Sequence, residues 1–298
     1  MIPASFEYHA PKTLDEALRL VQRHGDEAKL LAGGHSLLPL MKLRLAAPRY
    51  IIDIGNLRGM SYIREENGQI AIGALTTHAD IEQSALLAAK CPLLPETAAQ
   101  IGDVQVRNRG TIGGSLAHAD PGADYPAAIL ALDAEIIAAN TSGTRTIPAR
   151  DFFVDMLTTQ LQPGEILTQI RIAPRRPLSG TAYEKLHQPA SGFAIVGVAA
   201  NVLLGKGGKS IEQAAIGITG LAAKAFRAEA VEHALSGKTI SEKVIEDASR
   251  NAAQGIEPLS DLHASGEYRR EMARVFTRRA LVRAIEAARK GASPRGSA

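Results

Sequence analysis

Hydrophobic positions along the chain switch repeatedly between helical spacing and short continuous runs. Residues 13–24 predict an amphipathic helix, because its apolar side chains recur at helical spacing: Leu14, Ala17, Leu18 and Val21. Thr13 and Glu16 match the capping-box pattern at its start, and Gly25 is placed to end it. The apolar run at 29–32 then predicts a short strand.

Short strands and helices continue to alternate downstream. The pattern predicts strands at 50–54, 70–74, 134–138 and 166–172, and helices at 79–89, 93–101 and 125–132. This irregular mixture, with many glycines between the elements, favours an α+β fold over a regularly wound parallel sheet.

A domain boundary is predicted at 173–177, because the two prolines of this segment favour extended chain. Beyond it, apolar runs at 194–204 and 211–220 are joined by the glycine- and lysine-rich 205–209, which predicts an antiparallel hairpin. Helices are expected at 228–235, 241–253 and 267–290, followed by a disordered tail at 291–298.

Composition narrows the class of protein. The 298 residues are 45% hydrophobic and 22% charged, which is typical of a globular protein. Aromatic residues make up only 4% and Trp is absent, so a stacking platform for single-stranded nucleic acid is not expected. The formal charge is only +3, which gives no sign of a nucleic-acid partner. The start of the chain does not resemble a signal peptide, and no stretch approaches the roughly 20 apolar residues of a membrane span. A cytoplasmic location is expected.

Cysteine and histidine usage argues against a metal centre in this chain. Cys91 is the single cysteine, so it cannot form an internal disulfide or hold an iron–sulfur cluster. His35 and His118 have no partners at metal-ligand spacing, so no metal site is predicted. Asp120 and Asp124 raise the alternative of paired-carboxylate catalysis, but Pro121 and Gly122 between them favour a loop, and no catalytic residue is assigned.

Two glycine-rich segments are the strongest candidates for ligand binding. One spans residues 32–36, directly after a predicted strand, and the other spans residues 109–115. Paired glycines allow positive φ and let a ligand approach the backbone, and successive N–H groups in such turns can converge on an anion. Ser36, Thr111 and Ser115 add hydroxyl donors. Two interpretations stay open from the residues alone: the segments are only tight turns, or they are loops that grip a pyrophosphate from both sides.

These segments resemble the flavin-binding signatures of the molybdenum hydroxylases. The resemblance rests on residues 32–39 (AGGHSLLP), 111–115 (TIGGS) and 119–126 (ADPGADYP), and extends to 161–167 (LQPGEIL) and 183–186 (YEKL). More narrowly, these residues are similar to those of the FAD-binding medium subunits of the aerobic carbon monoxide dehydrogenase and xanthine dehydrogenase family. Ser115–His118 departs from the Asn-containing continuation that is common in that family.

The resemblance implies a p-cresol-methylhydroxylase-like FAD-binding fold. Its FAD-binding domain would span 1–176, with subdomains at about 1–56 and 57–176. A C-terminal flavoprotein domain with a three-stranded antiparallel sheet and helices would span 177–290.

The resemblance also implies a set of residues that bind FAD non-covalently: Ala32, Gly33, Gly34, His35, Ser36, Thr111, Ile112, Gly113, Gly114, Ser115, Asp124, Leu161, Lys185 and Phe193. The two glycine segments would hold the pyrophosphate and nearby atoms. Asp124 would accept hydrogen bonds from the flavin or its ribityl chain, Leu161 would pack on the isoalloxazine, and Lys185 would lie near the polar edge of the ring. Phe193 falls where related subunits carry an aromatic beside the flavin.

The implied function is electron transfer within an oxidoreductase complex. A large molybdopterin subunit would oxidise the substrate, a small iron–sulfur subunit would relay the electrons, and FAD on this chain would pass them to an external acceptor. The assembly would be a dimer of heterotrimers. Two alternatives stay open: a free-standing FAD-dependent reductase or oxidase of the same fold, and an assembly protein that has lost its flavin.

Overall fold

The structure, a computed structural model, describes residues 2–292 and contains three units, each built around its own sheet. The first is a small parallel sheet in the order β1-β3-β2, formed by β1 (Glu7–His9), β2 (Ala28–Leu31) and β3 (Tyr50–Asp53). Parallel neighbours need crossover connections. Helix α1 (Leu14–His24) with the short turn η1 (Gly25–Glu27) makes the first, and α2 (Leu37–Lys42) lies in the second.

The predicted first helix is confirmed. The Thr13 side chain accepts a hydrogen bond from the Glu16 N–H at 3.2 Å, and Gly25 ends the helix at φ 51. The capping box is incomplete, however, because the Glu16 carboxylate accepts from the N–H of Lys12 at 2.8 Å instead. Helix α2 was not predicted, and Leu38, Leu43 and Leu45 in and after it are exposed to solvent.

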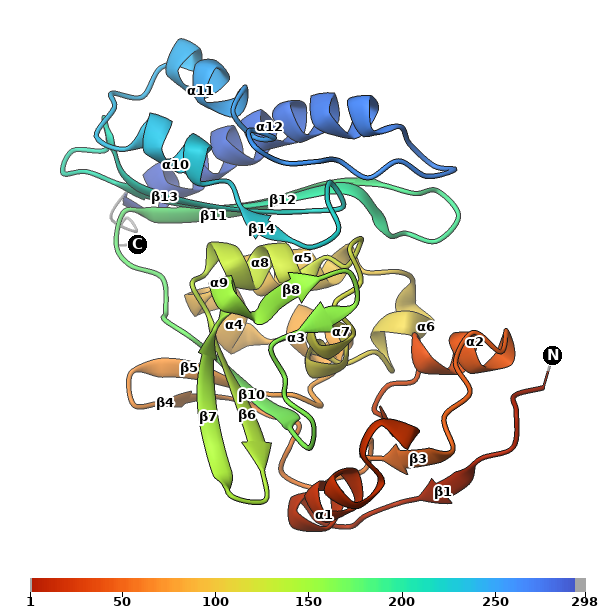
Figure 1. Cartoon of the computed structure of the whole chain (residues 1–298). Coiled ribbons are helices and arrows are strands. Elements are labelled where there is room, and N and C mark those ends of the chain that lie inside the picture. The colour runs from red at the N-terminus through yellow and green to blue at the C-terminus, as the bar shows by residue number, and fades with distance from the viewer. Residues whose placement is uncertain (1, 293–298) are drawn as a thin grey trace.

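The second unit is a five-stranded sheet in the order β4-β5-β10-β6-β7. All its neighbouring strands are antiparallel. Its strands are β4 (Ile63–Glu66), β5 (Gln69–Gly73), β6 (Glu135–Asn140), β7 (Gly143–Pro148) and β10 (Ile166–Ile172). The helices of the unit are α3 (His78–Glu82), α4 (Ala85–Lys90), α5 (Leu93–Ala99), α6 (Val104–Arg107), α7 (Ile112–His118), α8 (Tyr125–Ala131) and α9 (Ala149–Phe152). A two-stranded hairpin, β8 (Phe153–Asp155) and β9 (Thr158–Thr159), projects beside them (Figure 1).

The helix predicted at 79–89 is two helices. The break lies at Gln83 and Ser84, where the Ser84 hydroxyl caps α4 by accepting from the Leu87 N–H at 3.2 Å. Thr77 and Asp80 form a complete capping box at the start of α3. Local side-chain capping therefore overrides the continuous helical spacing of this segment.

The third unit is an antiparallel sheet in the order β11-β12-β13-β14, formed by β11 (Ser179–His187), β12 (Ala194–Leu204), β13 (Ile211–Thr219) and β14 (Phe226–Arg227). The predicted hairpin is confirmed, with Leu204 paired to Ile211. The sheet has one strand more than predicted, because β14 is only two residues long and leaves no pattern in the sequence.

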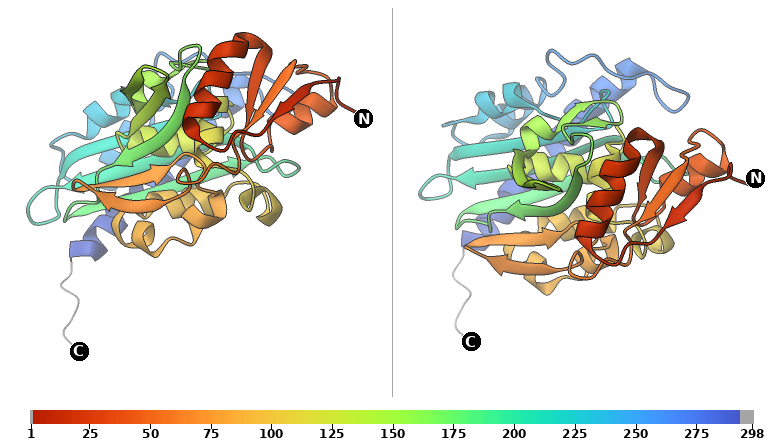
Figure 2. Two further views of the ribbon diagram at one scale, coloured as in Figure 1. Left: turned by 90° about the horizontal axis from the view of Figure 1, so that it is seen from below. Right: turned by 60° about the horizontal axis from the view of Figure 1, so that its bottom comes forward.

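Helices α10 (Glu229–Leu235), α11 (Glu242–Ser249) and α12 (Gly266–Ala292) cover one face of this sheet. Helices α5 and α8 of the second unit pack against the other face (Figures 1 and 2). Gly217 allows the close approach of α8, since a Cβ there would collide with the Ala127 carbonyl. The sheet of the third unit is thus a layer shared between two sets of helices.

The end of α12 differs slightly from the prediction, since the helix continues to Ala292. The rest of the predicted tail, residues 293–298, lies outside the described residues. No helix within residues 2–292 is both long enough and apolar enough to cross a membrane.

Candidate functional site

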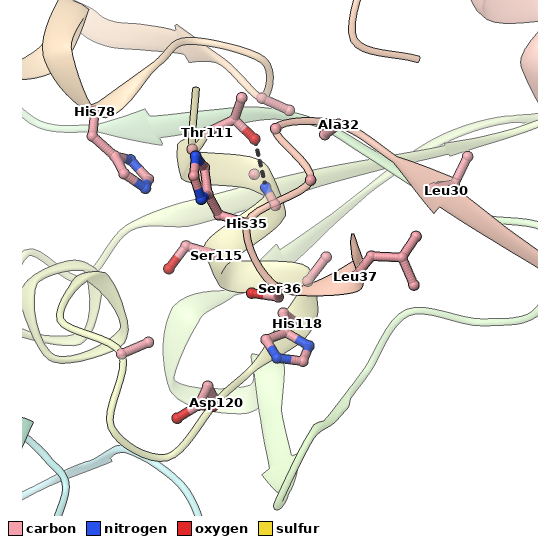
Figure 3. Close-up of a pocket in the computed structure, with 18 of the residues that line it drawn as sticks. Leu30, Ala32, His35, Ser36, Leu37, His78, Thr111, Ser115, His118 and Asp120 are labelled. Atoms are coloured by element: carbon pink, nitrogen blue, oxygen red, sulfur yellow. Dashed lines mark hydrogen bonds between the residues drawn. The ribbon is translucent and has the colours of Figure 1, made fainter. Parts of the chain in front are cut away.

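A cavity of about 490 Å³ lies where the three units meet. Its walls come from the segment after β2, the start of α7, the loop at 117–124, the segment at 157–167 and the loop before β12. Figure 3 shows His35, Ser36, Ser115, His118 and Asp120 gathered around this space, on segments far apart in the sequence. The volume is in the range of cofactor sites.

The first glycine segment presents unused hydrogen-bond donors to the cavity. The N–H groups of Gly33, Gly34, His35 and Ser36 have no acceptor among the described residues. The Ser36 side chain makes no capping bond to α2 either. Consecutive free N–H donors on a cavity wall can converge on an anion. The segment follows the carboxyl end of β2, the place where parallel sheets bind ligands.

The second glycine segment is built differently from the predicted loop, because residues 112–118 form helix α7 with Thr111 as its N-cap. Three of its N–H groups that could face a ligand are already used. Ile112 donates to Thr76 O at 3.1 Å, Gly113 to Ala74 O at 2.9 Å, and Gly114 to the Thr111 hydroxyl at 3.1 Å. The Ile112, Gly113 and Gly114 N–H groups are therefore not free for an anion, and the role of this segment in holding a pyrophosphate stays a prediction. The segment contributes the Ser115 side chain and a close-packed wall to the cavity.

Paired glycines at this site let protein segments approach each other. A Cβ on Gly33 would collide with the Arg109 carbonyl, and one on Gly113 would lie 2.7 Å from Ala74 O. Gly33 thus docks the segment after β2 against the residues before α7, and Gly113 docks the start of α7 against the end of β5. Gly34 has φ +81, the left-handed conformation that favours glycine.

A buried charge pair stands behind one wall of the cavity. Lys185 Nζ lies 2.8 Å from Asp124 Oδ1 and 2.9 Å from Oδ2, and the Tyr183 hydroxyl donates to Oδ1 at 2.5 Å. Burial raises the pKa of Asp124, while the Lys185 ammonium and the Tyr183 hydroxyl act to lower it. Tyr183 and Lys185 alternate along β11, so both point to the same face of the sheet.

Leu161 is positioned by an ion pair on the segment that carries it. Arg145 contacts both carboxylate oxygens of Glu165, at 2.6 and 2.8 Å, and donates to Gln160 O at 2.6 Å. Glu165 also accepts from the Gln162 N–H at 2.7 Å. The Arg145 guanidinium lowers the pKa of Glu165. Leu161 and Phe193 both line the cavity, and Phe193 is 43% exposed.

The structure brings together all but two of the predicted site residues. Ile112 is fully buried in the core, and Lys185 reaches the cavity only through Asp124. The other predicted residues line the cavity: Ala32, Gly33, Gly34, His35, Ser36, Thr111, Gly113, Gly114, Ser115, Asp124, Leu161 and Phe193. Their joint placement is a structural observation, and their contacts with a flavin stay a prediction.

Sequence reasoning missed His78, which also lines the cavity. Burial, together with the nearby charges of His35 and Arg107, lowers the pKa of His78 to about 4. Its Nδ1 has no hydrogen-bond partner among the described residues, and its ring lies edge-on to Tyr125 with centroids 5.2 Å apart. The available signal was the preceding Thr77, whose capping box fixes the start of α3.

The residues that the structure describes contain no group of three or more side chains suited to a metal ion. Burial raises the pKa of the Cys91 thiol to about 12, so this sulfur is inert as a ligand or nucleophile.

Comparisons with known proteins cover almost the whole chain. Residues 4–175 match the family model of the FAD binding domain in molybdopterin dehydrogenase, and residues 181–284 match the CO dehydrogenase flavoprotein C-terminal domain. The carbon monoxide dehydrogenase medium chain of Hydrogenophaga pseudoflava is 42% identical over 94% of this chain and 97% of its own length. The 6-hydroxypseudooxynicotine dehydrogenase complex subunit alpha of Paenarthrobacter nicotinovorans is 38% identical over 97% of both chains.

A solved structure has the same fold. It is a carbon monoxide dehydrogenase from Hydrogenophaga pseudoflava that lacks the Mo-pyranopterin moiety of its molybdenum cofactor. It superposes with a TM-score of 0.93 at 42% identity, over 96% of this chain and 99% of that one. The α+β architecture, an FAD-binding domain followed by a domain with an antiparallel sheet and helices, is thereby confirmed.

Proposed function

The chain belongs to the family of FAD-binding subunits of the molybdenum hydroxylases, and on this premise we propose that it binds FAD non-covalently in the cavity and transfers electrons. The observation that carries the proposal is the cavity itself. It brings the free N–H donors and hydroxyls of the two glycine segments and the apolar side chains of Leu161 and Phe193 around one space.

The donor set fits the pyrophosphate of FAD. The N–H groups of Gly33 to Ser36 supply consecutive donors, and Ser36 and Ser115 add hydroxyls from two different segments. An anion held this way receives hydrogen bonds from backbone dipoles that need no reorganisation. The N-terminal unit would therefore hold the phosphates, and the contact between Gly33 and Arg109 would keep its distance from α7 fixed.

Apolar side chains on the opposite walls suit the flavin ring. Leu161 and Phe193 would flank it, and the Arg145–Glu165 pair would hold the segment that carries Leu161. Asp124 would accept hydrogen bonds from polar groups of the flavin or its ribityl chain. Lys185 would compensate the buried carboxylate from behind, which is a positioning role in place of the predicted contact with the ring.

When bound, FAD supplies the redox chemistry, and the protein supplies binding, orientation and exclusion of water. Single electrons would come from an iron–sulfur subunit and leave for an external acceptor. Both cited relatives are named as one chain of a larger enzyme, although one enzyme acts on carbon monoxide and the other on 6-hydroxypseudooxynicotine. We therefore propose a large molybdopterin subunit and a small iron–sulfur subunit as partners, in a dimer of heterotrimers.

The test is native purification of the complex from its source. We expect one larger chain with molybdenum and one smaller chain with iron and acid-labile sulfide to co-purify with this chain. Acid precipitation should release free FAD into the supernatant. Flavin that stays with the precipitated chain would contradict non-covalent binding, and a chain that carries flavin without partners would favour the free-standing reductase or oxidase.

A further inference from the structure

The cavity wall at 119–124 is held by hydrogen bonds from the third unit. The Gly220 N–H donates to Pro121 O at 2.7 Å, and the Ala194 N–H donates to Gly122 O at 3.0 Å. The Thr219 hydroxyl, which is fully buried, lies 2.8 Å from both Pro121 O and Ala123 O. The start of β12 and the end of β13 thus provide the donors for three successive carbonyls of this loop.

These two strand ends are joined by a buried arginine from α12. Arg269 is 3% exposed, and its Nη1 donates to Ile195 O and Gly220 O, both at 2.7 Å. Its Nη2 donates to Asp261 Oδ2, also at 2.7 Å. Gly220 adopts φ +78, and a Cβ there would lie 2.5 Å from Ile195 O, so the two strand ends are closely spaced.

We propose that Arg269 is a positioning residue for the flavin site, which rests on the proposed function. Its guanidinium sets the spacing of the ends of β12 and β13, and these ends set the position of the loop at 119–124. Asp120, Ala123 and Asp124 of the loop line the cavity, and so does Phe193, which directly precedes β12. Loss of the guanidinium leaves the carbonyls of Ile195 and Gly220 without their shared donor. The loop and Phe193 then lose their fixed relation to the bound cofactor.

Arg227 offers a matched control. Its side chain is 10% exposed. Like Arg269, it donates both to a backbone carbonyl and to a carboxylate. It donates to Leu130 O, Asp133 and Glu232. None of these three residues lines the cavity. A substitution at Arg227 therefore reproduces the loss of a buried, hydrogen-bonded arginine without touching the loop.

The experiment titrates FAD into the full chain, freed of flavin, and measures the Kd and the Tm before FAD is added. Arg269→Gln and Arg227→Gln should both lower the Tm. Arg269→Gln should also raise the Kd for FAD by about tenfold or more, a loss of about 1.4 kcal/mol in binding. Arg227→Gln should leave the Kd within about twofold of the unsubstituted chain, because distant sites contribute independently. An equal Kd for both variants would show that Arg269 only stabilises the fold.

A second pair of variants tests the same route without removing a charge. Thr219→Val deletes the hydroxyl that faces the loop, whereas Thr219→Ser retains it. We expect the Val variant to weaken FAD binding and the Ser variant to restore it. Equal affinity of the two would contradict the link from the strand ends to the loop, even if Arg269→Gln does not fold. If the unsubstituted chain took up no FAD, the proposed function itself would be wrong.

Discussion

Acidification should destabilise the folded chain through His78, and the structure sets the size of the effect. Burial lowers the pKa of this imidazole from 6.5 to about 4. The unfolded chain therefore takes up a proton as the pH falls below about 6.5, while folded His78 stays neutral until the pH nears 4. The folded state therefore has its full stability above pH 6.5, where His78 is neutral in both states. This stability is lost as the pH falls from 6.5 towards 4.

Each pH unit in this window costs about 1.4 kcal/mol, so the free energy of unfolding should fall by about 2 kcal/mol between pH 7.5 and pH 5 on account of this residue. The assay is urea unfolding of the full chain at both pH values, with unfolding monitored by circular dichroism. Other groups titrate too, so the quantity to compare is the difference between the unsubstituted chain and His78→Gln.

Between pH 7.5 and pH 5, the unsubstituted chain should lose about 2 kcal/mol more free energy of unfolding than His78→Gln does. His263→Gln is the control, because His263 is exposed to solvent and its replacement should leave the pH dependence unaltered. A His78→Gln variant that loses stability on acidification as steeply as the unsubstituted chain does would refute this role of His78.

Three further perturbations follow from the site. Lys185→Met leaves the Asp124 carboxylate buried without its cation and should cost about 3–5 kcal/mol in urea unfolding. The double variant with Asp124→Asn should recover part of this loss, and no recovery would contradict the pairing. Gly113→Ala places a methyl group against the Ala74 backbone and should lower the free energy of unfolding by about 1–3 kcal/mol even without FAD. Urea unfolding of the flavin-free variant and of the flavin-free unsubstituted chain measures this difference. Because the Arg145 guanidinium lowers the pKa of Glu165, the stability advantage over Glu165→Gln should be present at neutral pH and lost as the pH falls below 4.5. An advantage that persists at about pH 3 would argue against that ion pair.

The sequence predicted the fold best where one physical signal dominated. The capped amphipathic helix α1 and the long hairpin of β12 and β13 both appear where their patterns placed them. Prediction failed where short-range hydrogen bonds overrode periodicity. The Ser84 cap divides one predicted helix into α3 and α4, and the Thr111 cap turns a predicted loop into α7.

For the site, the motifs identified the residues that gather at the cavity but did not reveal which protein groups some of them contact. Gly113 was expected to admit a ligand to its backbone, yet its N–H is bonded to Ala74 O and its missing Cβ admits a neighbouring strand end. Lys185 was expected beside the ligand and lies behind Asp124. Such assignments depend on which groups already have partners, and this depends on contacts between residues far apart in the sequence.

Roles of the third unit were the least visible in the sequence. Arg269 lies in a helix with several other arginines, and nothing in the sequence distinguishes it from them. Its burial and its bonds to Ile195 O and Gly220 O arise only from the tertiary fold.

The most direct test of the central claim is an equilibrium titration of the flavin-free full chain with FAD, followed by quenching of flavin fluorescence. We expect saturable binding with one FAD per chain. We also expect weaker binding when Ser36 and Ser115 are both replaced by alanine, since both residues line the cavity and neither caps a helix through its side chain. A chain that stays folded in the titration buffer and shows no saturable binding of FAD would contradict the account.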